Sequence, residues 1–165
     1  MRRHYPLILA LLVLSACGFH LRGSQKTVST GLPGVFVKAV DADKLASEVK
    51  LQLQTAGTRV TKMAGDAEYV LKVENENFKR TILSISPDTG KIEEYQLTLT
   101  AGISVSGADA KLLLSGETIS VTHDYTFDEE AVLGNVTQEE VFKNDLTQQA
   151  AVRIIRRLNA ALKNR

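Results

Sequence analysis

Three stretches of the chain alternate apolar and polar residues with a period of two, and this alternation constrains the fold more than any other feature. Successive side chains of a strand point to opposite faces, so each stretch predicts a strand with one apolar and one polar face. The turn residues Pro87-Asp88-Thr89-Gly90 and Gly107-Ala108-Asp109 separate the stretches, which indicates an antiparallel meander. The apolar members are Ala67, Tyr69, Leu71 and Val73; Tyr95, Leu97, Leu99, Ala101, Ile103 and Val105; and Ile119, Val121, Tyr125 and Phe127.

Two amphipathic helices are predicted, one before the meander and one after it. The first follows a short apolar strand at 35–40, with Asp41 or Asp43 as the predicted N-cap and Gly57 as the stop. The second is predicted to begin at the T-x-x-E capping box formed by residues 137–140. The apolar stripes at helical spacing are Ala42, Leu45, Ala46, Val49, Leu53 and Ala56, and then Phe142, Leu146, Ala150, Ile154, Leu158 and Leu162.

The element order β-α-β-β-β-α predicts an α+β fold. We expect a two-layer sandwich, with both amphipathic helices packed on one face of a four-stranded mixed sheet, as a single domain over residues 31–165. The other face of the sheet would stay open and would carry mostly Thr, Ser, Gln and Glu. Composition alone favours a solvated face, and a contact surface for a polar, concave partner is the alternative.

The N-terminus carries an export signal. A charged start and an apolar run lead to Leu14-Ser15-Ala16-Cys17, which has the form of a bacterial lipoprotein signal. Residues 1–16 are therefore predicted to be removed, Cys17 to receive a diacylglycerol and an N-acyl chain, and residues 17–30 to form a tether. A plain signal peptide would leave Cys17, the only cysteine, as an unpaired thiol in an oxidising compartment. The run is also shorter than the roughly 20 residues of a membrane-spanning helix.

Composition argues against several function classes. The chain has 20 Lys and Arg against 19 Asp and Glu, and removal of Arg2 and Arg3 with the signal leaves 18 against 19, a net charge of −1. A nucleic-acid partner is not expected, because such proteins usually show a basic excess. Enzyme activity is not expected either: His123 and Asp124 are neighbours on a strand and point to opposite faces. Metal-ligand spacings and phosphate loops are absent from the sequence, so neither a catalytic residue, a metal nor a cofactor is predicted.

One basic cluster is a candidate binding site. Lys79 and Arg80 lie at the predicted end of the first meander strand, and Lys91 lies across the turn that follows. These three residues are expected to crowd one end of the sheet, where they could meet a phosphate-bearing ligand. Ordinary solubilising charge at a hairpin end explains the cluster equally well.

Four segments resemble the LptE family of lipopolysaccharide (LPS)-assembly lipoproteins, and the resemblance extends over the mature chain. They are Cys17-Gly18-Phe19-His20-Leu21-Arg22-Gly23, Glu94-Tyr95-Gln96-Leu97, Tyr125-Thr126-Phe127-Asp128 and Arg153-Ile154-Ile155-Arg156-Arg157-Leu158. The resemblance implies an outer-membrane lipoprotein that plugs the β-barrel LPS translocon LptD, assists its assembly and binds LPS for delivery to the cell surface. It also implies that Lys79, Arg80 and Lys91 are candidate contacts for lipid A phosphates. The alternatives are a free-standing periplasmic lipoprotein that binds a small ligand and a lipoprotein hydrolase.

Overall fold

The computed structural model describes residues 34–127 and 132–163, and at 132–137 it describes the backbone alone. The predicted signal (1–16), the lipid site Cys17 and the tether (17–30) lie outside the described residues. The elements are β1 (Val35–Val40), α2 (Asp43–Thr55), the 3-10 turn η1 (Ala64–Asp66), β2 (Tyr69–Ile85), β3 (Ile92–Gly107), β4 (Leu112–Thr126) and α3 (Val132–Lys163). The predicted α+β order of strands and helices is confirmed.

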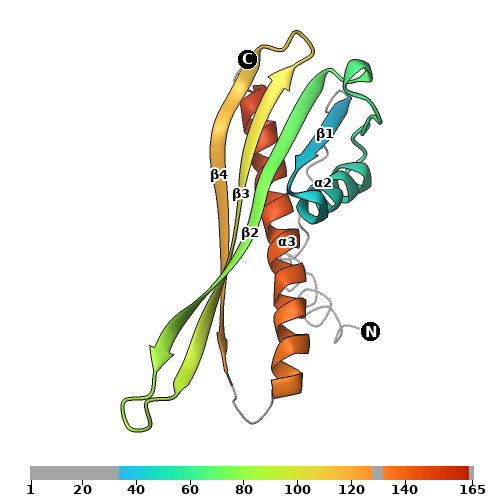
Figure 1. The fold of residues 1–165 in the computed structure, drawn as a ribbon. Helices are drawn as coiled ribbons and strands as arrows, with labels where there is room; N and C mark the ends of the chain where they lie inside the picture. Colours follow the sequence, from blue (N-terminus) through green and yellow to red (C-terminus); the bar gives the residue numbers. More distant parts are fainter. Residues whose placement is uncertain (1–33, 128–131, 164–165) are drawn as a thin grey trace, which may run out of the picture.

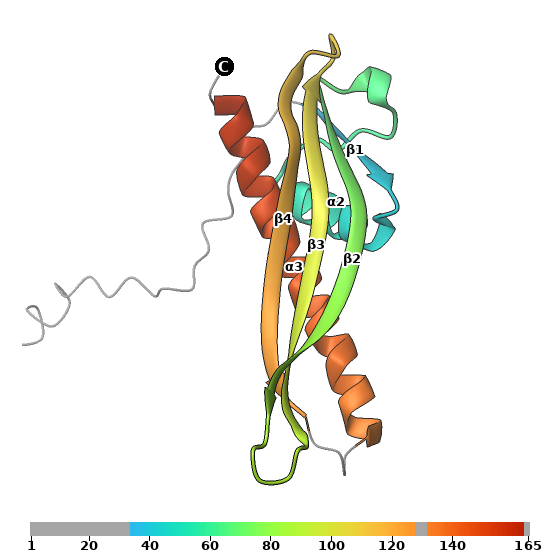
Figure 2. The same cartoon turned by 60° about the vertical axis from the view of Figure 1, so that its left-hand side comes forward.

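The four strands form one mixed sheet in the order β1-β2-β3-β4. The β1–β2 pair is parallel, while β2–β3 and β3–β4 are antiparallel, as the predicted meander requires. Both helices pack on the same face of this sheet, and α2 also contacts α3 (Figure 1). The turned view shows the opposite face of the strands uncovered by any helix (Figure 2). The predicted two-layer sandwich is therefore confirmed.

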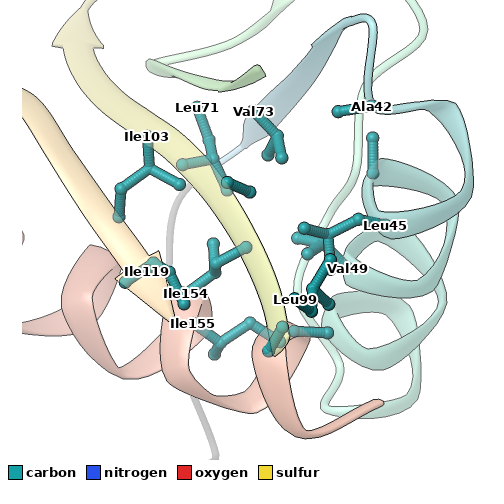
Figure 3. Packing of buried hydrophobic residues seen from close by; sticks show 14 of the residues in the cluster. Ala42, Leu45, Val49, Leu71, Val73, Leu99, Ile103, Ile119, Ile154 and Ile155 are labelled. Carbon is teal, nitrogen blue, oxygen red and sulfur yellow. The ribbon is translucent and has the colours of Figure 1, made fainter. Parts of the chain in front are cut away.

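The core lies between the sheet and the two helices. Leu45 and Val49 of α2, Leu71 of β2, Leu99 of β3 and Ile154 of α3 point toward one another in this layer (Figure 3). All five are completely or almost completely buried. Burial of one such side chain contributes roughly 1.5–3 kcal/mol, so this shared layer holds both helices against the sheet.

The predicted N-cap of α2 is wrong, and the predicted C-terminal stop is confirmed. No side chain at the N-cap position, Ala42, bonds to the helix, and Asp41 adopts a left-handed conformation (φ 52°). The Leu45 N–H instead donates to Oε2 of Glu76, at 3.1 Å, from β2. At the other end, Gly57 (φ 80°) closes a Schellman motif, in which backbone N–H groups of the two residues after the C-cap donate to Gln54 and Leu53.

Helix α3 begins earlier than its capping pattern predicted. The helix starts at Val132, five residues before Thr137, so the T-x-x-E pattern lies inside it. Residues 132–136 include no proline, so the backbone can continue the helix toward its N-terminus. The predicted four-residue stripe is confirmed, since Leu146, Ala150, Ile154 and Leu158 are all fully buried.

Strand β2 is much longer than its alternation predicted, because a bulge interrupts the pattern. The register with β3 shifts between Glu74 and Asn77, and Asn75 has a left-handed φ of 54°. One extra residue in β2 moves the inward-facing positions from odd to even numbers, so that Phe78 packs against the core. The strand then continues to Ile85. Lys79 and Arg80 therefore lie within the strand. The prediction that they lie at its end is wrong.

Candidate functional site

The open face of the sheet carries short polar side chains, as predicted. Thr98 lies opposite Thr122 and Thr100 opposite Ser120 in the β3–β4 register, and all four alternate with buried core residues. Further members of this surface, the hydroxyl face, are Ser104, Ser106 and Thr118. Short hydroxyl side chains lose little entropy on ordering, so this face suits a hydrogen-bonded interface.

Most charges on the open face of the sheet are near β1 and β2. Lys38 of β1 pairs in register with Lys72 of β2. Lys72 forms an ion pair with Glu74 at 2.6 Å, so Glu74 neutralises the charge of one of these two lysines. Farther along β2, Lys79 lies opposite Thr98 and is exposed on the same open face.

Arg80 faces the other side of the sheet from Lys79. It lies opposite the buried Leu97, and its guanidinium sits 4.7 Å from the ring centroid of Tyr95. Its Nη1 donates to Oε2 of Glu139 on α3 at 3.0 Å, so Arg80 connects the sheet to this helix. Cation–π and ionic contacts of this kind hold the guanidinium in place while its side chain remains half exposed.

Glu139 is the centre of this network. It accepts hydrogen bonds from Arg80 of β2 and, at 3.3 Å, from the Tyr125 hydroxyl of β4, and it pairs with Lys143 at 3.1 Å. Partial burial is the largest influence and acts to raise the Glu139 pKa, but Lys143 and Arg80 together outweigh it and lower that pKa. The pKa of Arg80 is raised, first by its interaction with Tyr125 and then by the charge of Glu139.

Lys91 lies at the turn between β2 and β3, just before Ile92. Its backbone N–H bonds to Thr89 Oγ1 and its carbonyl accepts from Ser86, which closes the hairpin. Lys91 is seven residues from Thr98, the partner of Lys79, or roughly 23 Å along the strand at about 3.3 Å per residue. The structure therefore does not gather Lys79, Arg80 and Lys91 at one point: two are on opposite faces and the third is at the hairpin tip.

Exposed apolar side chains on the β2–β3 hairpin were not predicted as part of any site. Ile82, Leu83 and Ile85 are 47%, 48% and 54% exposed. This end of the hairpin diverges from α3 in both views, so no helix covers it (Figures 1 and 2). The run Thr81-Ile82-Leu83-Ser84-Ile85 beside a turn was the sequence signal that could have identified it. We call these three residues, together with the turn at 86–91, the hairpin arm.

The described residues offer little for catalysis or metal binding. His123 stacks on Phe142 with ring centroids 4.2 Å apart, and Asp124 accepts a hydrogen bond from Gln96, so the two do not form a His–Asp pair. Within 34–127 and 132–163, no group of three His, Cys, Asp or Glu side chains could hold a metal ion. None of the described helices has both the length and the apolar character needed to span a membrane.

Comparison with known proteins matches the sequence to a family. The family model of LptE, lipopolysaccharide-assembly, matches residues 32–158. The chain belongs to the LptE family. LPS-assembly lipoprotein LptE from Pectobacterium atrosepticum is 30% identical over 156 residues, which cover 91% of this chain and 80% of that protein. The LptE of Photorhabdus laumondii is 28% identical, covering 91% and 81%.

Two solved structures have the same fold as this chain. Rare lipoprotein B from Shewanella oneidensis aligns with a TM-score of 0.69 and 23% identity, over 79% of this chain and 97% of that one. Lipoprotein B from Nitrosomonas europaea aligns with a TM-score of 0.73 and 24% identity, over 88% and 93%. The α+β fold predicted from the element order is therefore also the fold of lipoproteins in two other bacteria.

Proposed function

We propose that this LptE-family chain is an outer-membrane lipoprotein, anchored through acyl chains on Cys17, that plugs the β-barrel LPS translocon LptD. In this role it assists assembly of the barrel, binds LPS for delivery to the cell surface and carries out no catalytic step. Membership of a family named for LPS assembly supports the proposal. The observation that carries it is the hydroxyl face, which both helices leave free for a partner.

The chemistry of the hydroxyl face complements the inside of a barrel. The lumen of an outer-membrane barrel is polar, while its apolar band faces lipid. A plug therefore needs a polar surface whose side chains can form hydrogen bonds across a wet interface. Thr98, Thr100, Ser120 and Thr122 supply such side chains in two adjacent rows.

LPS carries phosphates and acyl chains, and the hairpin arm combines features that suit both. Lys91 places a cationic group on the arm, three residues from the acidic Asp88, and Ile82, Leu83 and Ile85 give the arm exposed apolar surface. We propose that Lys79 and Lys91 contact LPS phosphates directly. Arg80, which is paired with Glu139, would contribute with the part of its guanidinium that remains exposed.

Co-purification tests the plug directly. Thr100→Arg places a long charged side chain in the middle of the hydroxyl face, and Gln54→Arg places the same side chain on the exposed side of α2. We expect detergent-solubilised outer membranes to yield less barrel protein with Thr100→Arg than with wild type, and an unchanged amount with Gln54→Arg. Thermal unfolding of each variant verifies that it is folded.

Two results would contradict the plug. If the wild-type chain recovers no large barrel protein, the chain is a free-standing lipoprotein. If a folded Thr100→Arg variant recovers as much barrel as wild type, the hydroxyl face is not the contact surface.

A further inference from the structure

A groove of about 520 Å³ lies between the outer edge of β4 and the C-terminal half of α3. Arg153, Arg156 and Arg157 line its helix side, and Glu117 and Ser120 are among the residues on its strand side. Positions i, i+3 and i+4 of a helix share one face, so the three guanidinium groups converge on the same opening. Three arginines against one glutamate leave the groove with two net positive charges.

Two of these arginines are held by the strand. Nη1 of Arg153 donates to the backbone carbonyl oxygen of Ser120 at 2.6 Å. Nε of Arg157 lies 2.8 Å from Oε1 of Glu117. A guanidinium has five N–H donors, so each of these groups keeps donors for a ligand after making its contact. Part of the entropy cost of ordering the two side chains is thus met within the fold.

Arg156 lies between these two arginines in the sequence and is exposed. Its side chain makes no hydrogen bond or ion pair with another described residue, although it lines the groove. A plain basic surface near a helix C-terminus would complement the helix dipole. The helix dipole accounts for the positive charge of the groove. It does not account for the contacts of Arg153 and Arg157 with β4, or for Arg156 between them without such a contact.

We propose that this arginine groove binds a phosphate group, carried on a lipid headgroup or on a glycan. Planar guanidinium forks match the oxygens of phosphate and can bind them in a bidentate manner. An added acidic strand is the competing occupant, since β4 is an edge of the sheet. The structure favours phosphate over an added strand. An incoming strand would need the Ser120 carbonyl, which already accepts a hydrogen bond from Arg153.

The arginine groove is separate from the basic residues on β2. Arg80 contacts α3 at Glu139, 14 residues before Arg153, which is about 21 Å along a helix with a rise of 1.5 Å per residue. The inference also stands apart from the barrel plug, because phosphate binding can be measured on the purified chain without any partner.

The test is a phosphorus-31 NMR titration of the full-length chain in detergent with inorganic phosphate, at constant ionic strength set with chloride. Arg156→Gln removes the guanidinium that has no contact to lose, so this variant should fold normally. Since a charged hydrogen bond is worth about 1.5–3 kcal/mol, we expect Arg156→Gln to weaken phosphate binding by about tenfold or more. Lys44→Gln on α2 is the matched control and should bind like wild type.

Two further arms identify the carrier of the phosphate. Glucose 6-phosphate tests a phosphorylated glycan, and vesicles of phosphatidylglycerol in phosphatidylcholine test a lipid headgroup. If wild type binds glucose 6-phosphate or the vesicles and Arg156→Gln does not, the result supports the site and identifies the molecule that carries the phosphate.

Three outcomes overturn the inference. The first is that wild type binds no phosphate beyond the chloride control. The second is that wild type and Arg156→Gln bind phosphate equally. The third is that Arg156→Gln recovers less barrel protein while its phosphate binding is unchanged. The last would make the arginine groove a protein interface.

Discussion

At the scale of single residues, Glu76 stabilises a helix from a position that local sequence does not reveal. Glu76 belongs to β2 and Leu45 to α2, yet the carboxylate of one caps the backbone of the other across 31 positions. The bulge at Asn75 makes this possible, because it turns the next side chain toward the helix layer. Asp41 and Asp43 are residue types that commonly cap helices, but neither caps α2. Glu76 of the distant strand β2 accepts the hydrogen bond instead.

Glu76→Ala should therefore destabilise the protein. Loss of an N-terminal helix cap costs about 1 kcal/mol, and we expect the free energy of unfolding in urea to fall by that amount. Glu76→Gln retains an oxygen acceptor and should lose less. Glu68→Ala, an exposed glutamate just before β2, is the control and should change little. Unaltered stability in Glu76→Ala would show that the Leu45 contact does not stabilise α2.

Glu139 should make stability dependent on acid pH. Its pKa in the folded protein lies below the ordinary value of 4.5, because Lys143 and Arg80 outweigh the effect of burial. The charged form therefore stabilises the fold above about pH 4.5, and this contribution is lost as the pH falls through the lowered pKa. Glu139→Gln should cost roughly 1 kcal/mol at pH 7 and flatten the loss below pH 4.5. Urea unfolding at several pH values measures both, and a pH profile identical to that of wild type would contradict the assignment.

At the scale of elements, the sequence predicted what depends on repetition and missed what depends on a single residue. The period-two stretches of β3 and β4 and the four-residue stripe of α3 all lie where predicted. The length of β2 was missed, because one extra residue at Asn75 reverses the alternation and hides Phe78. The separation of Lys79 from Arg80 follows from the same strand geometry, since neighbours on a strand face opposite sides. Pairing of Arg80 with Glu139 required the tertiary fold and could not be predicted locally.

The end of α2 allows a clean test of backbone conformation. Gly57 has φ of 80° and open space around its Cα, so Gly57→Ala adds no clash and only strains the backbone. A side chain in the left-handed region costs roughly 1–2 kcal/mol, and we expect stability to fall by about that amount. Gly65→Ala also enters open space, at a residue without positive φ, and should be close to neutral. Equal effects of the two substitutions on the thermal midpoint would refute the role of Gly57 in the Schellman motif.

At the scale of the whole molecule, the fold separates three surfaces. The hydroxyl face lies on one side of the sheet. The helices cover the other side, and the β2–β3 hairpin extends past them (Figure 2). This division places Lys91 of the proposed LPS contact on a different surface from the proposed barrel contact, whereas Lys79 lies opposite Thr98 on the open face of the sheet. Mutations at Lys91 and on the hydroxyl face can therefore separate the two functions.

Lys79→Glu with Lys91→Glu should weaken LPS binding. Two contacts to phosphate would become repulsive, so we expect the affinity of the purified chain for LPS to fall by about tenfold or more. The barrel complex should still assemble in the single variant Lys91→Glu, because Lys91 lies at the hairpin tip and Lys79 lies opposite Thr98 of the hydroxyl face. Lys44→Glu with Lys50→Glu on α2 makes the same change of charge on the helix side and is the control. Binding that falls equally in both double variants would show a general effect of net charge and not a site.

The hairpin arm also means that a single strand spans two levels of stability. Residues 69–74 of β2 lie between β1 and β3 and under the helix layer, so their amides are released only when the domain unfolds. Beyond Glu74 the same strand pairs with β3 alone, and from Ile82 it also exposes its apolar side chains, so the hydrogen bonds of this end can open without disturbing the core. The part of the molecule proposed to meet LPS can thus exchange its hydrogen bonds and adapt its shape, while the remainder of the same strand stays fixed.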